Sequence, residues 1–161
     1  MKIIIMIIFI FPLLFAGGAE SGEKSNMLGF ELRSLKTDET VDLGTYRGKW
    51  LFILLFKEEC KWCAQALHTY EVLTKGENGD NLNVIAVGIG ADPVAMRRMS
   101  RGISYPVLLA DHQLKRALGE VKVTPYTLVA DPQGNFKTKL VGYQKEDALA
   151  GIVHQLLEDK K

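Results

Sequence analysis

The sequence is poor in the residues that cross-link chains, ligate metals or bind nucleic acid. Its 161 residues include two cysteines and three histidines, and the formal net charge is +1. Two cysteines cannot build a disulfide scaffold, and they supply only part of the ligand set of a structural zinc site. A nearly neutral chain without a basic stripe of interleaved aromatic residues is a poor partner for nucleic acid. We therefore expect no metal site and no nucleic-acid interface.

No apolar run in the N-terminal part of the chain reaches the ~20 residues that a membrane-spanning helix needs. The run Ile3–Phe15 is uncharged but short, Pro12 interrupts it, and the small residues Ala16–Ala19 follow. This layout is typical of a secretory signal peptide. We predict a signal peptide over residues 1–19, cleaved near Ala19, and a periplasmic or otherwise exported protein. The alternative is a membrane anchor that is never removed.

The rest of the chain predicts one domain. The overall composition is 47% hydrophobic and 24% charged, as in ordinary globular proteins, and the chain has no internal repeat or low-complexity segment. A polar linker over residues 20–26 precedes the predicted domain, which spans residues 27–158. A short polar tail, residues 159–161, follows it. This length suffices to bury a core.

Within this domain, hydrophobic patterns of strand and helix type alternate. We predict strands over Gly29–Leu35, Glu39–Leu43, Lys49–Phe56, Leu82–Gly90 and part of Tyr105–Asp111, and a hairpin over Pro125–Tyr143. We predict helices over Cys60–Thr74, from Pro93 to near Gly102, over His112–Leu118 and over Lys145–Leu157. The last helix is predicted to bury Ala148, Leu149, Ile152, Val153 and Leu156. This order of elements implies an α/β fold with a mixed sheet.

The two cysteines lie two residues apart, in the stretch Cys60-Lys61-Trp62-Cys63, where a buried strand passes into a helix. A disulfide that closes so short a loop would add only about 2 kcal/mol to stability, so a purely structural role is a weak explanation. The helix N-terminus stabilises a thiolate on Cys60, Lys61 acts in the same direction, and the carboxylates of Glu58 and Glu59 oppose it, so the sequence does not fix the sign of the net effect. We predict that Cys60 attacks, that the better shielded Cys63 resolves, and that Trp62 offers an apolar face to partners.

The chain resembles the exported thioredoxin-like thiol–disulfide oxidoreductases of the TlpA/ResA type in three segments that occur in order: VDLGTYRGKWLFILLFKEECKWC, YPVLLAD and VTPYTLVADPQGNFKTKLVGY. The resemblance covers roughly Met27 to Leu157. It implies a thioredoxin-like fold, with a mixed central sheet flanked by helices, an N-terminal β-hairpin extension and an inserted βα unit over Leu82–Arg101. It also implies that Thr124–Pro125 is a cis peptide beside the disulfide, and that the backbone of Thr124 pairs with the substrate.

The chain departs from that family at the positions around the cysteines. Glu59 stands where a tryptophan is usual, and Trp62 stands where a proline is frequent. Leu54 and Ala66 occupy the positions of the carboxylates that assist proton transfer in related proteins. Glu58 or Glu59 is a candidate replacement, and the alternative is that both are solvated carboxylates at a helix start.

We predict an exported thiol–disulfide oxidoreductase with no bound cofactor, whose redox group is the Cys60–Cys63 disulfide. Its predicted clients are protein disulfides or dithiols, for example an apocytochrome, and a membrane-bound redox partner would reset it. The sequence does not fix the direction of electron flow. Two alternatives stay open. The first is a peroxiredoxin-like thiol peroxidase, which would carry a threonine where Lys57 stands. The second is a metallochaperone that holds Cu(I) on the two thiolates.

Overall fold

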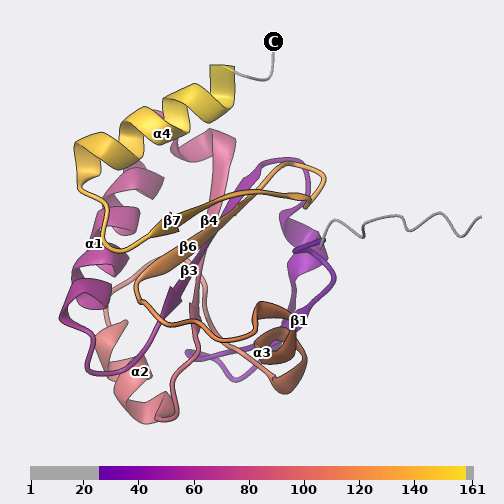
Figure 1. The fold of residues 1–161 in the computed structure, drawn as a ribbon, viewed down its shortest axis with the longest axis vertical. Coiled ribbons are helices and arrows are strands. Elements are labelled where there is room, and N and C mark those ends of the chain that lie inside the picture. The colour runs from indigo at the N-terminus through magenta and orange to yellow at the C-terminus, as the bar shows by residue number, and fades with distance from the viewer. Residues whose placement is uncertain (1–25, 159–161) are drawn as a thin grey trace, which may run out of the picture.

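The computed structural model describes residues 26–158 (Figure 1). The predicted signal peptide, residues 1–19, the linker up to residue 25 and the tail, residues 159–161, lie outside the described residues. Within residues 26–158, none of the helices combines the length and the apolar character that a bilayer crossing requires.

The described residues form strands and helices close to the predicted ranges. The strands are β1 Glu31–Ser34, β2 Thr40–Asp42, β3 Trp50–Phe56, β4 Leu82–Gly88, β5 Val107–Leu109, β6 Tyr126–Ala130 and β7 Phe136–Val141. The helices are α1 Lys61–Lys75, α2 Pro93–Met99, α3 His112–Leu118 and α4 Glu146–Glu158, with 3₁₀ turns η1 Leu43–Tyr46 and η2 Gly79–Asn81.

The described strands form one mixed sheet in the order β2-β1-β5-β4-β3-β6-β7. Strand β4 is parallel to β3 and β5, and the other neighbours are antiparallel. The hairpin β1–β2 lies at one edge and the hairpin β6–β7 at the other. The unit β4–α2 follows α1 as the resemblance implied. The predicted thioredoxin-like α/β fold is therefore confirmed.

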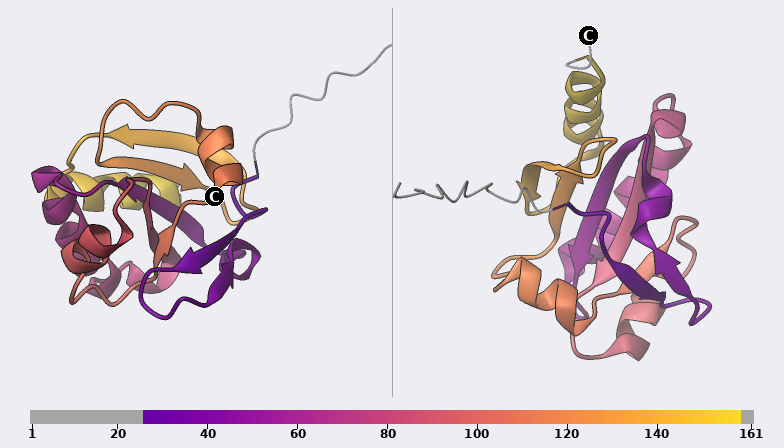
Figure 2. Two further views of the ribbon diagram at one scale, coloured as in Figure 1. Left: turned by 90° about the horizontal axis from the view of Figure 1, so that it is seen from below. Right: turned by 90° about the vertical axis from the view of Figure 1, so that its right-hand side faces the viewer.

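Strand β3 is buried along its whole length because its residues alternate between two cores on opposite faces of the sheet. Phe52 and Leu54 pack in the core that includes residues of α1 and α4. Leu51 and Ile53 pack in the core that includes Leu114 of α3. Figures 1 and 2 show the resulting layers, with α1 and α4 on one side of the central strands and α3 on the other. The unbroken apolar run before Cys60 is thus explained by burial on both faces.

Side-chain caps fix the starts of two helices where the sequence predicts them. The carboxylate of Asp92 accepts hydrogen bonds from the backbone N–H groups of Val94 and Ala95 at 2.9 and 3.1 Å, and Pro93 occupies the first helical position. Asp111 accepts in the same way from the N–H of Leu114, at 2.7 Å.

Two predicted ends are corrected by the turns that follow them. Strand β4 ends at Gly88 rather than Gly90, because the chain leaves the sheet there to approach the turn after β3. Helix α2 ends at Met99 rather than near Gly102. Single-turn hydrogen bonds follow from the N–H groups of Arg101 and Ile103, and Gly102 between them has a φ of +85°, which breaks the helical path.

Helix α4 buries a narrower face than the sequence predicts. Leu149 and Val153 are buried, Ile152 and Leu156 are only partly buried, and Ala148 is exposed. Residues four apart lie on one face of a helix, so a single stripe through Leu149 and Val153 meets the core. Ala148 lies outside that stripe and is exposed, and α1 is the helix with which α4 makes its main contacts.

Glu71 is a buried carboxylate that ties α1 to the loop before β5. The backbone N–H of Ser104 donates to one carboxylate oxygen at 2.7 Å, and the ammonium of Lys75 lies 2.7 Å from the other. Burial alone would raise the pKa of Glu71, but the hydrogen bonds from Lys75 and Ser104 outweigh it and hold the pKa at about 2, against an ordinary 4.5.

Because the folded-state pKa of Glu71 is depressed, its contribution to stability is present above the unfolded-state pKa and is lost as the pH falls toward the folded-state value. We expect Glu71→Gln to lower the free energy of unfolding at pH 7 by about 2 kcal/mol. We expect a clearly smaller difference from the wild type at pH 3. Urea unfolding at the two pH values measures this, and an equal loss at both would contradict the assignment.

Candidate active site

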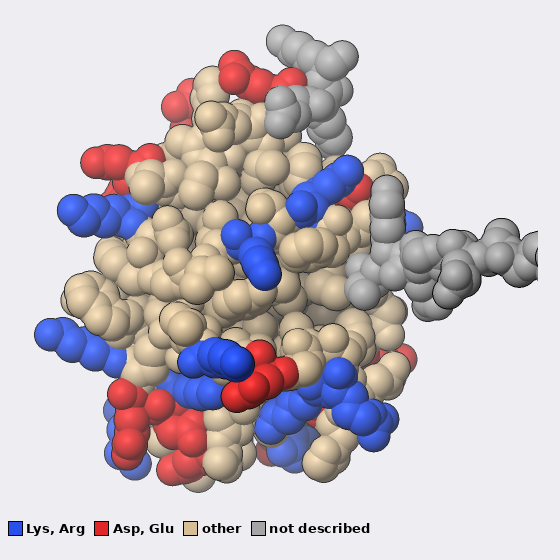
Figure 3. Space-filling model, in the orientation of Figure 1, with Lys and Arg blue, Asp and Glu red and all other residues tan. Residues whose placement is uncertain are grey.

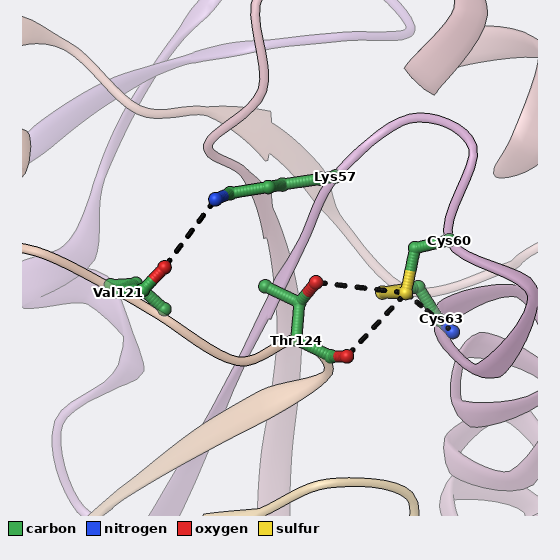
Figure 4. The surroundings of a disulfide bond; sticks show 5 residues. All are labelled: Lys57, Cys60, Cys63, Val121 and Thr124. Atoms are coloured by element: carbon green, nitrogen blue, oxygen red, sulfur yellow. Dashed lines mark hydrogen bonds between the residues drawn. A yellow bond between two sulfur atoms is a disulfide. The ribbon is translucent and has the colours of Figure 1, made fainter.

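The disulfide predicted between Cys60 and Cys63 is present where β3 passes into α1 (Figure 4). Cys60 is the N-cap of α1, and its sulfur accepts the backbone N–H of Cys63 at 3.2 Å. Cys63 lies within the first turn and is 0% exposed, whereas Cys60 is partly exposed. A sulfur that approaches from outside therefore meets Cys60 first.

Thr124 brings two polar groups to the sulfur of Cys60. Its hydroxyl oxygen and its carbonyl oxygen each lie 3.6 Å from Cys60 Sγ. After reduction, the hydroxyl and the N–H of Cys63 would donate to a thiolate on Cys60, while the carbonyl would accept the proton of a thiol. The Thr124–Pro125 peptide is cis, which confirms the isomer that the resemblance implied, and Pro125 is buried.

The protein beneath the disulfide is apolar. Leu54 and Ala66 are 1% and 3% exposed and belong to the same buried core as Cys63. Neither side chain can carry a proton, so the buried carboxylates of related proteins have no counterpart at these two positions. We therefore expect protons to reach Cys63 from the side of Cys60, the partly exposed cysteine of the pair.

Glu58, one of the two candidate replacements for those carboxylates, is held by hydrogen bonds from backbone N–H groups. One oxygen accepts the N–H of Ala91 at 2.8 Å and that of Asp92 at 3.2 Å, and a Cβ at Gly90 would overlap the carboxylate. Hydrogen bonds from the backbone N–H groups of Glu58 itself and of Ala91 lower the pKa of Glu58. A carboxylate held in its ionised form is a poor proton donor, so Glu58 instead ties the turn before Cys60 to the start of α2. Glu59 stays exposed.

The side chains near the disulfide that were predicted to tune it lie in solvent. Glu59 has a left-handed backbone, with φ of +59°, which turns the chain from β3 into the cap of α1. Lys61 is exposed in the first turn of α1, and neither residue takes part in an ion pair among the described residues. Lys57 points away from the disulfide, and its ammonium donates to the carbonyl of Val121 at 3.4 Å (Figure 4).

The residues predicted to bind substrate line one groove beside the disulfide, with a volume of about 360 Å³. Its lining residues are Trp62, Val123, Thr124, Pro125, Gly142 and Tyr143. Trp62 is 54% exposed and stacks on Tyr143, with ring centroids 5.6 Å apart. We name this surface the aromatic groove.

The sequence did not identify Tyr143, Gly142 or Val123 as parts of the site. A usable signal was the predicted hairpin itself, because antiparallel pairing returns the end of its second strand to the start of its first. Gly142 accordingly donates its N–H to the carbonyl of Pro125 at 2.9 Å, which sets Tyr143 opposite Trp62.

The AhpC/TSA family model matches residues 25–150. The chain belongs to the AhpC/TSA family. This AhpC/TSA protein is similar to the thiol-disulfide oxidoreductase ResA of Bacillus subtilis (strain 168), with 24% identity over 143 residues, 87% of this chain and 79% of that relative. The predicted resemblance to such oxidoreductases is confirmed, and so is the predicted activity class, with the protein's own disulfide as its redox group.

Solved structures share the fold of this AhpC/TSA protein. The exposed lipoprotein thioredoxin of Streptococcus pneumoniae strain TIGR4 is 23% identical, with a TM-score of 0.65 over 78% of this chain and 98% of that one. A secreted disulfide oxidoreductase of Mycobacterium tuberculosis, described as homologous to E. coli DsbE, is 16% identical, with a TM-score of 0.68 over 81% of this chain and 98% of that one.

Proposed function

We propose that this AhpC/TSA protein is exported and exchanges disulfides with protein clients, with Cys60 as the attacking sulfur and Cys63 as the resolving one. The supporting observation is the asymmetry of the pair. Cys60 is reachable from solvent and receives hydrogen bonds at its sulfur, whereas Cys63 is fully buried behind it. A thiolate stabilised in an accessible place is the species that attacks a disulfide.

In the reducing direction, the Cys60 thiolate attacks one sulfur of a client disulfide. A bond forms between Cys60 and that sulfur, and the other client sulfur leaves as a thiolate that takes up a proton. Cys63 then loses its proton and attacks Cys60, which releases the second client thiolate and forms the Cys60–Cys63 disulfide. The client gains two electrons and the protein loses two, and the oxidising direction runs the same steps backwards.

The aromatic groove adjoins the reacting sulfur, and we assign it to the client chain. The backbone of Thr124 would pair with the client, Pro125 would shape the floor, and Trp62 would contact a client side chain. Export is supported by the N-terminal layout of the sequence and by the secreted or exposed character of the two similar proteins described above. An exported client such as an apocytochrome, and a membrane-bound redox partner that resets the pair, complete the proposal.

The test measures disulfide exchange and peroxide consumption on the same preparation. We expect the purified protein to reduce insulin with dithiothreitol as the electron source, or to oxidise a reduced client protein with oxidised glutathione. We expect reduced protein to consume hydrogen peroxide no faster than a free thiol, because Lys57 occupies the place of an activating hydroxyl and its ammonium is turned toward Val121.

Two results would contradict the proposal. Rapid peroxide consumption without disulfide exchange would favour the thiol peroxidase. Stoichiometric copper that survives dialysis of anaerobically purified protein would favour the metallochaperone.

A further inference from the structure

A second hollow lies where the segment before β6 passes Lys57, the residue that follows β3. It has a volume of about 320 Å³ and is lined by Lys57, Ile89, Lys115, Leu118, Gly119, Glu120, Val121 and Lys122. We name it the lysine hollow. The residues from Val121 to Pro125 separate the two surfaces, since Val121 and Lys122 line the hollow and Val123, Thr124 and Pro125 line the groove. Figure 4 shows Lys57 directed to Val121 and the disulfide beside Thr124.

The lysine hollow has a surplus of positive charge. Its lining holds three ammonium groups and the single carboxylate of Glu120, which lies 4.0 Å from the ammonium of Lys122. Both of these side chains are mostly exposed, so their ion pair is weak and a client carboxylate could replace Glu120 beside Lys122. Among residues 26–158, the hydrogen-bond partner of the Lys57 ammonium is the neutral carbonyl of Val121. In Figure 3, Lys and Arg side chains gather over the region where Figure 1 places α3, the helix that carries Lys115.

The aromatic groove, by contrast, carries no charged side chain in its lining. The side chain of Trp62 is more than half exposed although it stacks on Tyr143, and Val123 is 49% exposed. An apolar side chain placed there would be removed from water against aromatic and aliphatic surface. The two surfaces therefore favour residues of opposite character.

Both surfaces lie within reach of one short client segment. The carbonyl of Thr124 is 3.6 Å from Cys60 Sγ, which is the atom that bonds to the client cysteine in the mixed disulfide. Val121 lies three residues before Thr124, and three residues of chain span at most about 10 Å. Consider a client backbone that runs along Thr124. Client residues two or three positions to one side of its cysteine then lie over the groove, and those on the other side lie over the hollow.

We propose that the preferred client segment carries an apolar residue on one side of its reactive cysteine and acidic residues on the other. The apolar residue occupies the aromatic groove, and the carboxylates lie against Lys57, Lys115 and Lys122. This selectivity rests on the proposed disulfide exchange, and it names the class of substrate for that reaction. Charge complementarity acts mainly on the rate of encounter, so the preference is strongest at low salt.

The experiment follows the reaction of the full-length reduced protein with short peptides whose single cysteine is blocked as a 2-thiopyridyl disulfide. The Cys60 thiolate attacks the peptide sulfur and releases pyridine-2-thione, which is followed by its absorbance. One peptide has leucine and glutamates on opposite sides of the cysteine, a second replaces the glutamates by lysines, and a third replaces the leucine by serine. Each peptide is made in two versions, with the apolar residue before or after the cysteine. Faster reaction of the leucine–glutamate peptide in either version supports the proposal.

We expect the leucine–glutamate peptide to react about tenfold faster than the lysine peptide at low salt, with the difference shrinking at high salt. We also expect it to react faster than the serine peptide. The double variant Lys115→Glu with Lys122→Glu should reverse the order of the glutamate and lysine peptides. Lys49→Glu is the matched control, because Lys49 precedes β3 and so lies at the opposite end of that strand from Cys60. Its charge change equals that of Lys115→Glu or Lys122→Glu made singly; each of those two single variants should narrow the rate difference between the glutamate and lysine peptides, whereas Lys49→Glu should leave it unchanged.

Equal rates for the glutamate and lysine peptides, with normal reactivity toward the 2-thiopyridyl disulfide of cysteine itself, would overturn this inference and leave the proposed exchange intact. A narrowing by Lys49→Glu equal to that of Lys115→Glu or Lys122→Glu alone would also overturn it, since net charge alone would then explain the preference. Failure to react with any of the disulfides would instead count against the proposed function, so the two failures are distinguishable.

Discussion

Replacing Cys60 by serine is expected to abolish disulfide exchange with protein clients. Cys60 is the partly exposed sulfur of the pair, and the N–H of Cys63 and the hydroxyl of Thr124 are directed to it. A serine hydroxyl in that place is not ionised at neutral pH and cannot form a disulfide. Loss of the nucleophile should lower the exchange rate by on the order of a thousandfold or more. Insulin reduction, or oxidation of a reduced client, measures this directly.

The control for Cys60→Ser is the stability of the variant. The disulfide closes a loop of only a few residues and is expected to contribute about 2 kcal/mol, so the variant should still fold. Circular dichroism and a thermal unfolding curve check this. A folded Cys60→Ser variant that retained full exchange activity would show that Cys60 is not the attacking sulfur.

Replacing Cys63 by serine is expected to give the opposite phenotype, in which a covalent intermediate accumulates. Cys60 would still attack a client disulfide, but no second sulfur would lie behind it to release the client. Cys60 and Cys63 are the two cysteines of the chain, so the variant has no thiol of its own that could release the client. The mixed disulfide should persist until a reductant is added, while multiple turnover falls to a small fraction of the wild-type rate.

Intact mass spectrometry after acid quenching detects this adduct as the mass of the protein plus that of the client. The same treatment of Cys60→Ser is the matched control, and it should give no adduct because its remaining cysteine is buried. Adducts formed equally by both variants, or only by Cys60→Ser, would reverse the assigned roles.

Local patterns in the sequence were enough to predict most of the fold. The continuous apolar run of Trp50–Phe56 indicated a strand covered on both faces, and the two cores on either side of β3 confirm this. Asp92 and Asp111 are caps whose chemistry acts over a few residues, so the starts of α2 and α3 were predicted correctly. The disulfide was predictable for the same reason, since its spacing and its place at a helix start are both local.

Contacts between distant segments were not predictable from such patterns. Tyr143 meets Trp62 only because β7 returns beside β6, and Lys57 meets Val121 only because the loop before β6 crosses the turn after β3. The role of Glu58 depends on the backbone of Ala91, which is far away in the sequence. The exposure of Ala148 follows from which helix lies against α4, and that too is decided by tertiary packing.

The central claim is that the Cys60–Cys63 disulfide is a working redox couple rather than a structural cross-link, and its reduction potential tests this most directly. The full-length protein is equilibrated in dithiothreitol or glutathione buffers of defined potential and quenched with acid. Free thiols are then alkylated, and mass spectrometry gives the fraction of reduced protein at each potential. We predict one two-electron transition with a midpoint between about −120 and −270 mV, the range of known thiol–disulfide oxidoreductases. A pair that stays oxidised below about −300 mV, as structural disulfides do, would contradict the claim.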